Sequence, residues 1–167
     1  MIASETIFGN LLNLLAATQL LTGGVPSGGP IFLTHTRRLP QVSDVGQAIQ
    51  PALYLYEGPE IVTEKAGLAL TKFEIRALIF IFFRNVGGPN EVASTQLNGL
   101  RDAVIYQMEQ QTLAADGITV QPLLAGNRQT LGGVCYHARV LGTIIKNEGT
   151  MNQQGAIVFP ISILSGM

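Results

Sequence analysis

One stretch, 68–83, limits the possible fold more than any other because its residues alternate with period two. Its odd positions form one largely apolar face: Ala69, Thr71, Phe73, Ile75, Ala77, Ile79, Ile81 and Phe83. A helix would spread these side chains around its axis, whereas a strand places all of them on one side. The stretch therefore predicts a long strand with one face against a core.

The even positions of the same stretch change character along the strand. After Leu70, the charged residues come first and the apolar ones follow: Lys72, Glu74, Arg76, then Leu78, Phe80, Phe82. A strand that is apolar on both faces needs cover on both. We therefore expect a neighbouring subunit, or the longer helix, over the three apolar residues. The charged row is either a solvated sheet face or a polar surface that meets another subunit or lines a channel.

The remaining sequence predicts two helices and several further strands. Apolar residues at helical spacing predict helices over 4–21, ended by Gly23-Gly24, and over 92–111. Alternation and turn signals predict the other strands, at 31–36, 49–56, 131–146 and 155–164. This order predicts one α+β domain over 1–167, with a mostly antiparallel sheet of about four or five strands and two main helices on one face.

Two proline-containing segments indicate where one predicted strand ends and where another lies in the sheet. Glu57-Gly58-Pro59-Glu60 is a turn signal, so the strand at 49–56 should end there. Pro160 lies inside the strand 155–164 and cannot donate a ladder hydrogen bond, which predicts an edge strand or a bulge. Residues 23–30 and 37–48 are expected to be loops.

The chain is poor in charge. Of its 167 residues 47% are hydrophobic and 13% charged, whereas an average soluble domain has about 25% charged residues. No apolar run reaches the roughly 20 residues of a membrane-spanning helix, and Glu5 stands where a secretory signal would have a basic residue. We expect a soluble domain, outside any membrane, whose surface is partly covered by partners.

The charged residues point to protein partners. The net charge is −1 and the basic residues are scattered, which argues against binding to nucleic acid. The adjacent pair Arg37 and Arg38 is either a solvated loop pair or a docking point for an acidic patch. Glu57 belongs to an acidic loop group that either aids solubility or contacts a partner.

No catalytic, cofactor or metal site is predicted. A nucleophile elbow, a P-loop and a dinucleotide fingerprint are all absent. His35 and His137 lie far apart without other ligands at metal-binding spacing, and a single Cys135 excludes an intramolecular disulfide. Cys135 and His137 flank Tyr136 and would share a strand face, so a Cys–His dyad is the one enzymatic alternative.

Several longer motifs resemble a known family. They are Gln50-Pro51-Ala52-Leu53-Tyr54-Leu55-Tyr56-Glu57 and Arg128-Gln129-Thr130-Leu131-Gly132-Gly133-Val134-Cys135-Tyr136-His137, followed by Gly142, Glu148-Gly149 and the closing stretch 157–164. Together they resemble the tail terminators of tailed bacteriophages, of the minor-tail-protein-U type. The similarity covers most of the chain and extends to the order of helices and strands, whereas the Gly/Pro-rich loop at 23–30 departs from the family.

The resemblance implies a structural virion protein. Such proteins form a ring, usually of six subunits, that caps the head-proximal end of the tail tube, stops its growth and offers a docking surface to the head connector. The implied partners are sister subunits, the tail tube protein and a head–tail connector or stopper, with the sheath as a further candidate. DNA would pass through the lumen without specific binding. The implied location is the neck of the virion, and the host cytoplasm during assembly.

We expect the function to be carried by surfaces. The candidate interface residues are Arg37, Arg38, Glu57, Lys72, Glu74, Arg76, Leu78, Phe80 and Phe82. The alternatives within assembly proteins are a head–tail stopper or adaptor and a cap at the baseplate end. An alternative of another class is a non-viral binding module that covers its two-faced strand internally.

Overall fold

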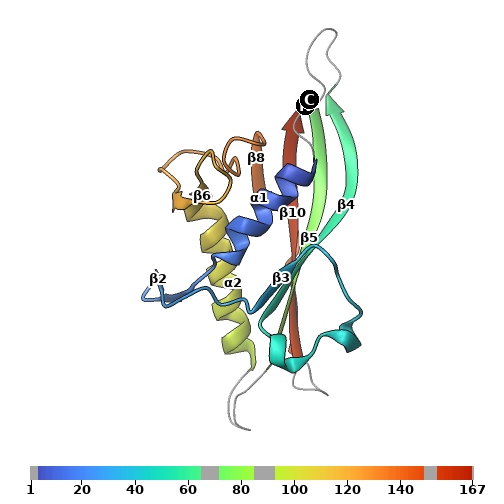
Figure 1. Ribbon diagram of the computed structural model, residues 1–167, viewed down its shortest axis with the longest axis vertical. Helices are drawn as coiled ribbons and strands as arrows, with labels where there is room; N and C mark the ends of the chain where they lie inside the picture. Colours follow the sequence, from blue (N-terminus) through green and yellow to red (C-terminus); the bar gives the residue numbers. More distant parts are fainter. Residues whose placement is uncertain (1–3, 65–71, 85–92, 149–153, 167) are drawn as a thin grey trace.

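A computed structural model describes residues 4–64, 72–84, 93–148 and 154–166. Two helices, α1 (Ser4–Ala16) and α2 (Ala93–Gln110), lie on the same face of a six-stranded sheet (Figure 1). The strand order is β3-β4-β5-β10-β8, and β9 also pairs with β10. All pairings in this sheet are antiparallel except that of β3 with β4. The predicted α+β class and the largely antiparallel sheet are confirmed.

The sheet strands differ greatly in length. They are β3 (Thr34–Thr36), β4 (Ala52–Glu64), β5 (Lys72–Arg84), β8 (His137–Val140), β9 (Ile145–Asn147) and β10 (Gln154–Gly166). Two small hairpins lie outside the sheet, β1 (Leu20–Thr22) with β2 (Val25–Ser27), and β6 (Gln111–Leu113) with β7 (Val120–Pro122). The predicted loop 37–48 contains the short 3₁₀ turn Val42–Asp44, and a second one, Gln47–Ile49, follows.

The period-two pattern of 68–83 predicted the central strand correctly over its described part. The odd positions from Ile75 to Phe83 are buried in β5 and face both helices. On β10, Ile157, Phe159 and Ile161 pair with β5 and complete this face. Residues 68–71 lie outside the described part of the chain. The main core is therefore the layer between the sheet and the two helices.

The first helix is shorter than predicted. It ends at Ala16, because the chain turns at Thr18, whose N–H and Oγ1 both donate to the carbonyl oxygen of Leu15 at 3.0 and 2.6 Å. The next residues form the β1–β2 hairpin. Gly23 and Gly24 have φ of 61° and 82°, the left-handed conformation that a two-residue hairpin turn requires. The glycine pair therefore closes a hairpin and does not end the helix.

The predicted turn at 57–60 is wrong, because β4 continues to Glu64. Glu57 lies opposite Ala77 and Glu60 opposite Ile75, so two residues of β4 face one of β5. This β-bulge accommodates Pro59, which has no N–H for the ladder. The glycine before it, at position 58, is required because a Cβ there would collide with the carbonyl oxygen of Arg76.

Of the two alternatives predicted for Pro160, an edge strand or a bulge, the edge strand is wrong. β10 lies between β5 on one side and the short strands β8 and β9 on the other. Leu141 N–H donates to the carbonyl oxygen of Pro160 at 2.9 Å, so the proline nitrogen faces the same side. There β8 ends at Val140 and β9 begins at Ile145. The missing donor therefore falls at the interruption between two strands, where no ladder partner is required.

The strand predicted over 131–146 begins later and is split. Residues 131–136 form turns, in which Leu131, Gly132 and Gly133 have φ of 52°, 78° and 88°. Buried Gln129 holds this region. Its Nε2 donates to the carbonyl oxygens of Met108 and Gln111, and its Oε1 accepts from the Leu131 N–H and from Thr112 Oγ1 at 3.0 and 2.8 Å.

Candidate interface on the outer sheet face

The face of the six-stranded sheet that points away from α1 and α2, here the outer face, carries most of the predicted interface residues. The register places side chains on it in rows across the strands. One row is Tyr54, Phe80, Val158 and Ile145, and the next is Tyr56, Leu78 and Pro160. Directly opposite side chains in such rows lie about 5 Å apart. The outer face therefore has a contiguous apolar region across four strands.

Phe82, at one end of this region, is covered by its own chain. It is 4% exposed and packs with Val45, Ala52 and Tyr54 in a second, smaller core under the segment 39–50. Its ring lies 5.9 Å from that of Tyr54, between centroids. The expectation that a neighbouring subunit or the longer helix covers Phe82 is wrong, because α2 packs on the opposite face and the loop supplies the cover.

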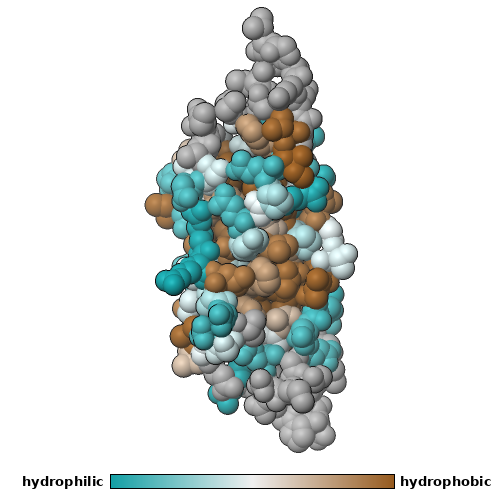
Figure 2. Space-filling view, turned by 90° about the vertical axis from the view of Figure 1, so that its right-hand side faces the viewer, coloured by the Kyte–Doolittle hydropathy of each residue, from teal (hydrophilic) through white to brown (hydrophobic). Residues whose placement is uncertain are grey.

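Leu78 and Phe80 remain half-buried. Together with neighbours from three other strands they form what we call the apolar band: Tyr56, Leu78, Phe80, Ile145, Val158 and Pro160. Tyr56 is 48% and Ile145 58% exposed. A groove of about 270 Å³ runs beside it, lined by Leu39, Pro40, Phe80, Phe82, Ile145, Asn147, Ala156 and Val158. Viewed from the side of β4, hydrophobic side chains cross the middle of the molecule (Figure 2).

The charged row continues the outer face beyond the apolar band. Arg76 Nε pairs with Glu74 Oε1 at 2.8 Å, and Ser162 Oγ donates to the same oxygen at 3.0 Å. Lys72 Nζ lies 5.8 Å from the centroid of the Tyr136 ring. The side chain of Arg76 is 49% exposed against 21% for Glu74. The side chains of the charged row therefore interact with their neighbours. Within the Glu74–Arg76 pair, the cation is the more accessible member.

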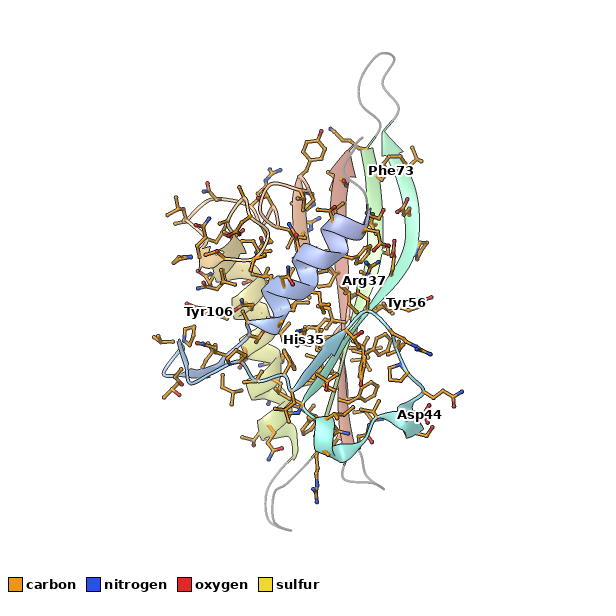
Figure 3. The ribbon with its side chains drawn as sticks, viewed as in Figure 1. His35, Arg37, Asp44, Tyr56, Phe73 and Tyr106 are labelled. Carbon is orange, nitrogen blue, oxygen red and sulfur yellow. The ribbon has the colours of Figure 1, made fainter. Side chains whose placement is uncertain are left out.

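Arg37 and Glu57 lie on the other side of the sheet. Arg37 pairs with Glu5 of α1 and, at 3.2 Å, with Glu57 of β4, and its guanidinium stacks over Phe8 at 5.3 Å (Figure 3). The hydrogen bond with Arg37 lowers the pKa of the Glu5 carboxyl. Arg37 therefore ties α1 to β4 within the chain, and the structure does not bring it to the same surface as the apolar band. Arg38 is exposed.

Cys135 and His137 do not form the predicted shared face. Cys135 belongs to the main core, and burial raises the pKa of its thiol to about 12. His137 pairs with Leu164 on the outer face, where burial, followed by Arg139 and Arg128, lowers its pKa. A thiol that stays protonated at neutral pH and an imidazole on the opposite sheet face do not make an activated nucleophile.

A cavity of about 920 Å³ lies away from the outer face. It is lined by Leu20, Leu21, Gly24, Gln50, Pro51, Phe83, Arg84, Thr95, Gln96, Gly99, Leu100 and Asp102. The Oε1 of Gln50 is buried and has no hydrogen-bond partner in the described part of the chain. The lining is mainly apolar and gathers no set of acid, base and nucleophile.

Among the described residues, no group of three or more His, Cys, Asp and Glu side chains could hold a metal ion. In the same ranges, neither helix is both long and apolar enough to cross a membrane.

A scan against models of known protein families finds no match to this chain, and a search of curated proteins finds no similar sequence.

Sequence reasoning identified only Leu78 and Phe80 of the six residues of the apolar band. The other four, Tyr56, Ile145, Val158 and Pro160, were not among the predicted interface residues. The signal for Val158 was present, because the even positions 156, 158 and 160 of the last strand are all apolar. Ile145 had no such signal, since its strand is three residues long and its place beside Val158 follows from the tertiary register.

Proposed function

We propose that this chain is a structural subunit of a homo-oligomeric ring, of the tail-terminator type, that caps the head-proximal end of a phage tail tube. In this role the ring stops tube growth and presents a docking surface to the head connector. It acts in the virion by contact between surfaces and catalyses no reaction.

The apolar band is the observation that carries the proposal. Leu78, Phe80 and Val158 are half-buried in the isolated subunit, and the band continues across strands to exposed Ile145. A contiguous apolar region bordered by charged residues has the anatomy of a protein–protein interface. The low share of charged residues, 13%, fits a subunit that buries much of its surface in an assembly.

A monomeric binding module is the second candidate, and one observation favours it. The segment 39–50 covers Phe82 within the same chain, so part of the two-faced strand needs no partner. The cover stops short of Leu78, which belongs to neither core. A ring accounts for the rest of the band, whereas a monomer leaves it facing water.

Electron microscopy of tail tubes tests the capping role. Purified protein is mixed with tubes polymerised from the cognate phage tail tube protein. We expect a ring at one end of each tube and an arrest of its elongation, because a terminator binds only the growing end. Tubes that elongate unchanged, or rings found only on isolated connectors, contradict the proposal. The second of these results identifies a stopper instead.

A further inference from the structure

The side of the molecule opposite the apolar band carries its own exposed apolar residue beside a charge. The β6–β7 hairpin packs against α1 and α2, on the far side of the sheet from the band (Figure 1). Ile118 in its turn is 72% exposed. Asn13 Nδ2 of α1 donates to the carbonyl oxygen of Gly117 at 2.9 Å, so the turn is attached to the helix layer. The hairpin therefore presents Ile118 from an anchored position.

Asp116, two residues before Ile118, is an anion without a cationic partner among the described residues. Its Oδ1 accepts hydrogen bonds from the N–H groups of Ile118 and Thr119, both at 2.9 Å. The hydrogen bond from the Thr119 hydroxyl, followed by these two backbone bonds, lowers the pKa of its carboxyl. Asp116 is the only charged residue between positions 110 and 127. The turn is thus acidic and apolar at once.

The apolar band has a complementary cation at its border. Arg139 of β8 lies opposite Ser162, in the row next to Leu78 and Pro160. It is exposed, and no carboxylate of the described residues pairs with it, whereas Arg76 is already paired with Glu74. Leu141, two residues after Arg139, is 40% exposed and bonds to Pro160. An exposed cation without a carboxylate partner among the described residues therefore borders the apolar band.

We propose that copies of this chain associate head to tail, with the β6–β7 turn of one copy seated on the outer face of the next. Ile118 lies on the apolar band beside Leu78 and Pro160, and Asp116 pairs with Arg139. The two patches are different and lie on opposite sides of one subunit, so the contact is heterologous and repeats from copy to copy until rotation closes a ring. This inference rests on the proposed ring and names its contact.

The β1–β2 hairpin has an exposed apolar residue but no acidic residue beside it. Val25 in β2 is 63% exposed, so exposure alone does not distinguish the two hairpins. No charged residue occurs between positions 6 and 36, and the β1–β2 hairpin therefore offers nothing to Arg139. Charge complementarity selects the β6–β7 turn as the occupant.

A mixing experiment tests the contact. Ile118→Asp removes one patch and Leu78→Asp the other, and each variant alone should self-associate at least about tenfold more weakly than the wild type. Mixed in equal amounts, they retain one intact contact between them, so we expect a heterodimer of twice 17.8 kDa by native mass spectrometry. Val25→Asp is the matched control and should assemble as the wild type does. Circular dichroism checks that every variant is folded.

A charge test addresses the ion pair separately. Asp116→Asn keeps the oxygen that accepts from the Ile118 N–H and removes only the charge. We expect this variant and Arg139→Gln each to weaken association about fivefold, and the double variant to be no weaker than either single one. Independent, additive effects contradict the pairing.

Failure of the contact and failure of the ring give different results. If the wild type forms a ring and Ile118→Asp forms the same ring, or if the mixture stays monomeric, the proposed contact is wrong while the ring stands. If the wild type is a monomer at every concentration, the ring is wrong and the contact with it.

Discussion

Phe82→Asp should unfold the subunit. Phe82 is 4% exposed and packs against Tyr54, Ala52 and Val45. Loss of a buried phenylalanine side chain costs about 3–5 kcal/mol, and burial of a carboxylate without a partner adds to this. The total is comparable with the roughly 5–15 kcal/mol that stabilise a typical domain. Thermal unfolding followed by circular dichroism should show a protein with no cooperative transition.

Leu78→Asp is the matched control, since it lies on the same strand and face, four residues away. Leu78 is half-buried and belongs to neither core. A substitution on an accessible sheet face changes the free energy of unfolding by roughly 1 kcal/mol or less. We therefore expect a folded protein with a nearly unchanged melting temperature. Equal destabilisation by the two substitutions would mean that the segment 39–50 does not cover Phe82.

Gln129→Leu should cost about 4 kcal/mol of the free energy of unfolding. Its amide serves two carbonyl oxygens, a backbone N–H and the Thr112 hydroxyl, and each buried group left without a partner costs roughly 1–3 kcal/mol. These bonds connect the end of α2 and β6 with the turn that precedes β8. Denaturant unfolding, read as the change in midpoint at constant slope, measures the loss.

Gln121→Leu provides the comparison for this substitution. Gln121 lies on the adjacent strand β7 and is exposed. The same chemical change there should alter the free energy of unfolding by no more than about 0.5 kcal/mol. A loss at Gln129 as small as that at Gln121 would show that water replaces the amide and that the four bonds do not hold the turn.

The long strands and the helices could be predicted because their signals are local. The odd positions from Ile75 to Phe83 are all apolar, as a strand with that face against the core requires, and all five are buried in β5. The second helix, predicted over 92–111, is confirmed over its described part, since α2 spans Ala93–Gln110 and residue 92 lies outside the described residues. Local spacing also predicted which residues face the core.

The errors arise where tertiary pairing overrides a local signal. Gly58 and Pro59 favour a turn in any local reading, but β5 supplies thirteen residues of partner strand, and a bulge keeps the pairing. Pro160 favours an edge in the same way, but the interruption between β8 and β9 admits it to the interior of the sheet. The outcome at each proline depends on which residues of the neighbouring strands lie opposite it, and the spacing of residues along the sequence does not show this.

The candidate site was predicted in part for the same reason. Leu78 and Phe80 lie on the outer face, as predicted. Their position could be predicted because the sequence of their own strand already implied a second apolar face. Arg37 and Glu57 were grouped with them by character alone, whereas the register of β4, which is unbroken up to Glu57, places this residue opposite Ala77 on the helix side, where Arg37 pairs with it. The cover over Phe82 comes from a loop without periodicity, so no pattern identified it.

Light scattering on the wild type and on Leu78→Asp, measured over a range of concentrations, tests most directly whether the apolar band joins subunits. We expect the wild type to have the mass of a closed ring, about six times 17.8 kDa if it resembles tail terminators, and Leu78→Asp to have the mass of a folded monomer. A wild type that remains at 17.8 kDa throughout, or a Leu78→Asp protein that assembles like the wild type, would contradict a role of this face in assembly.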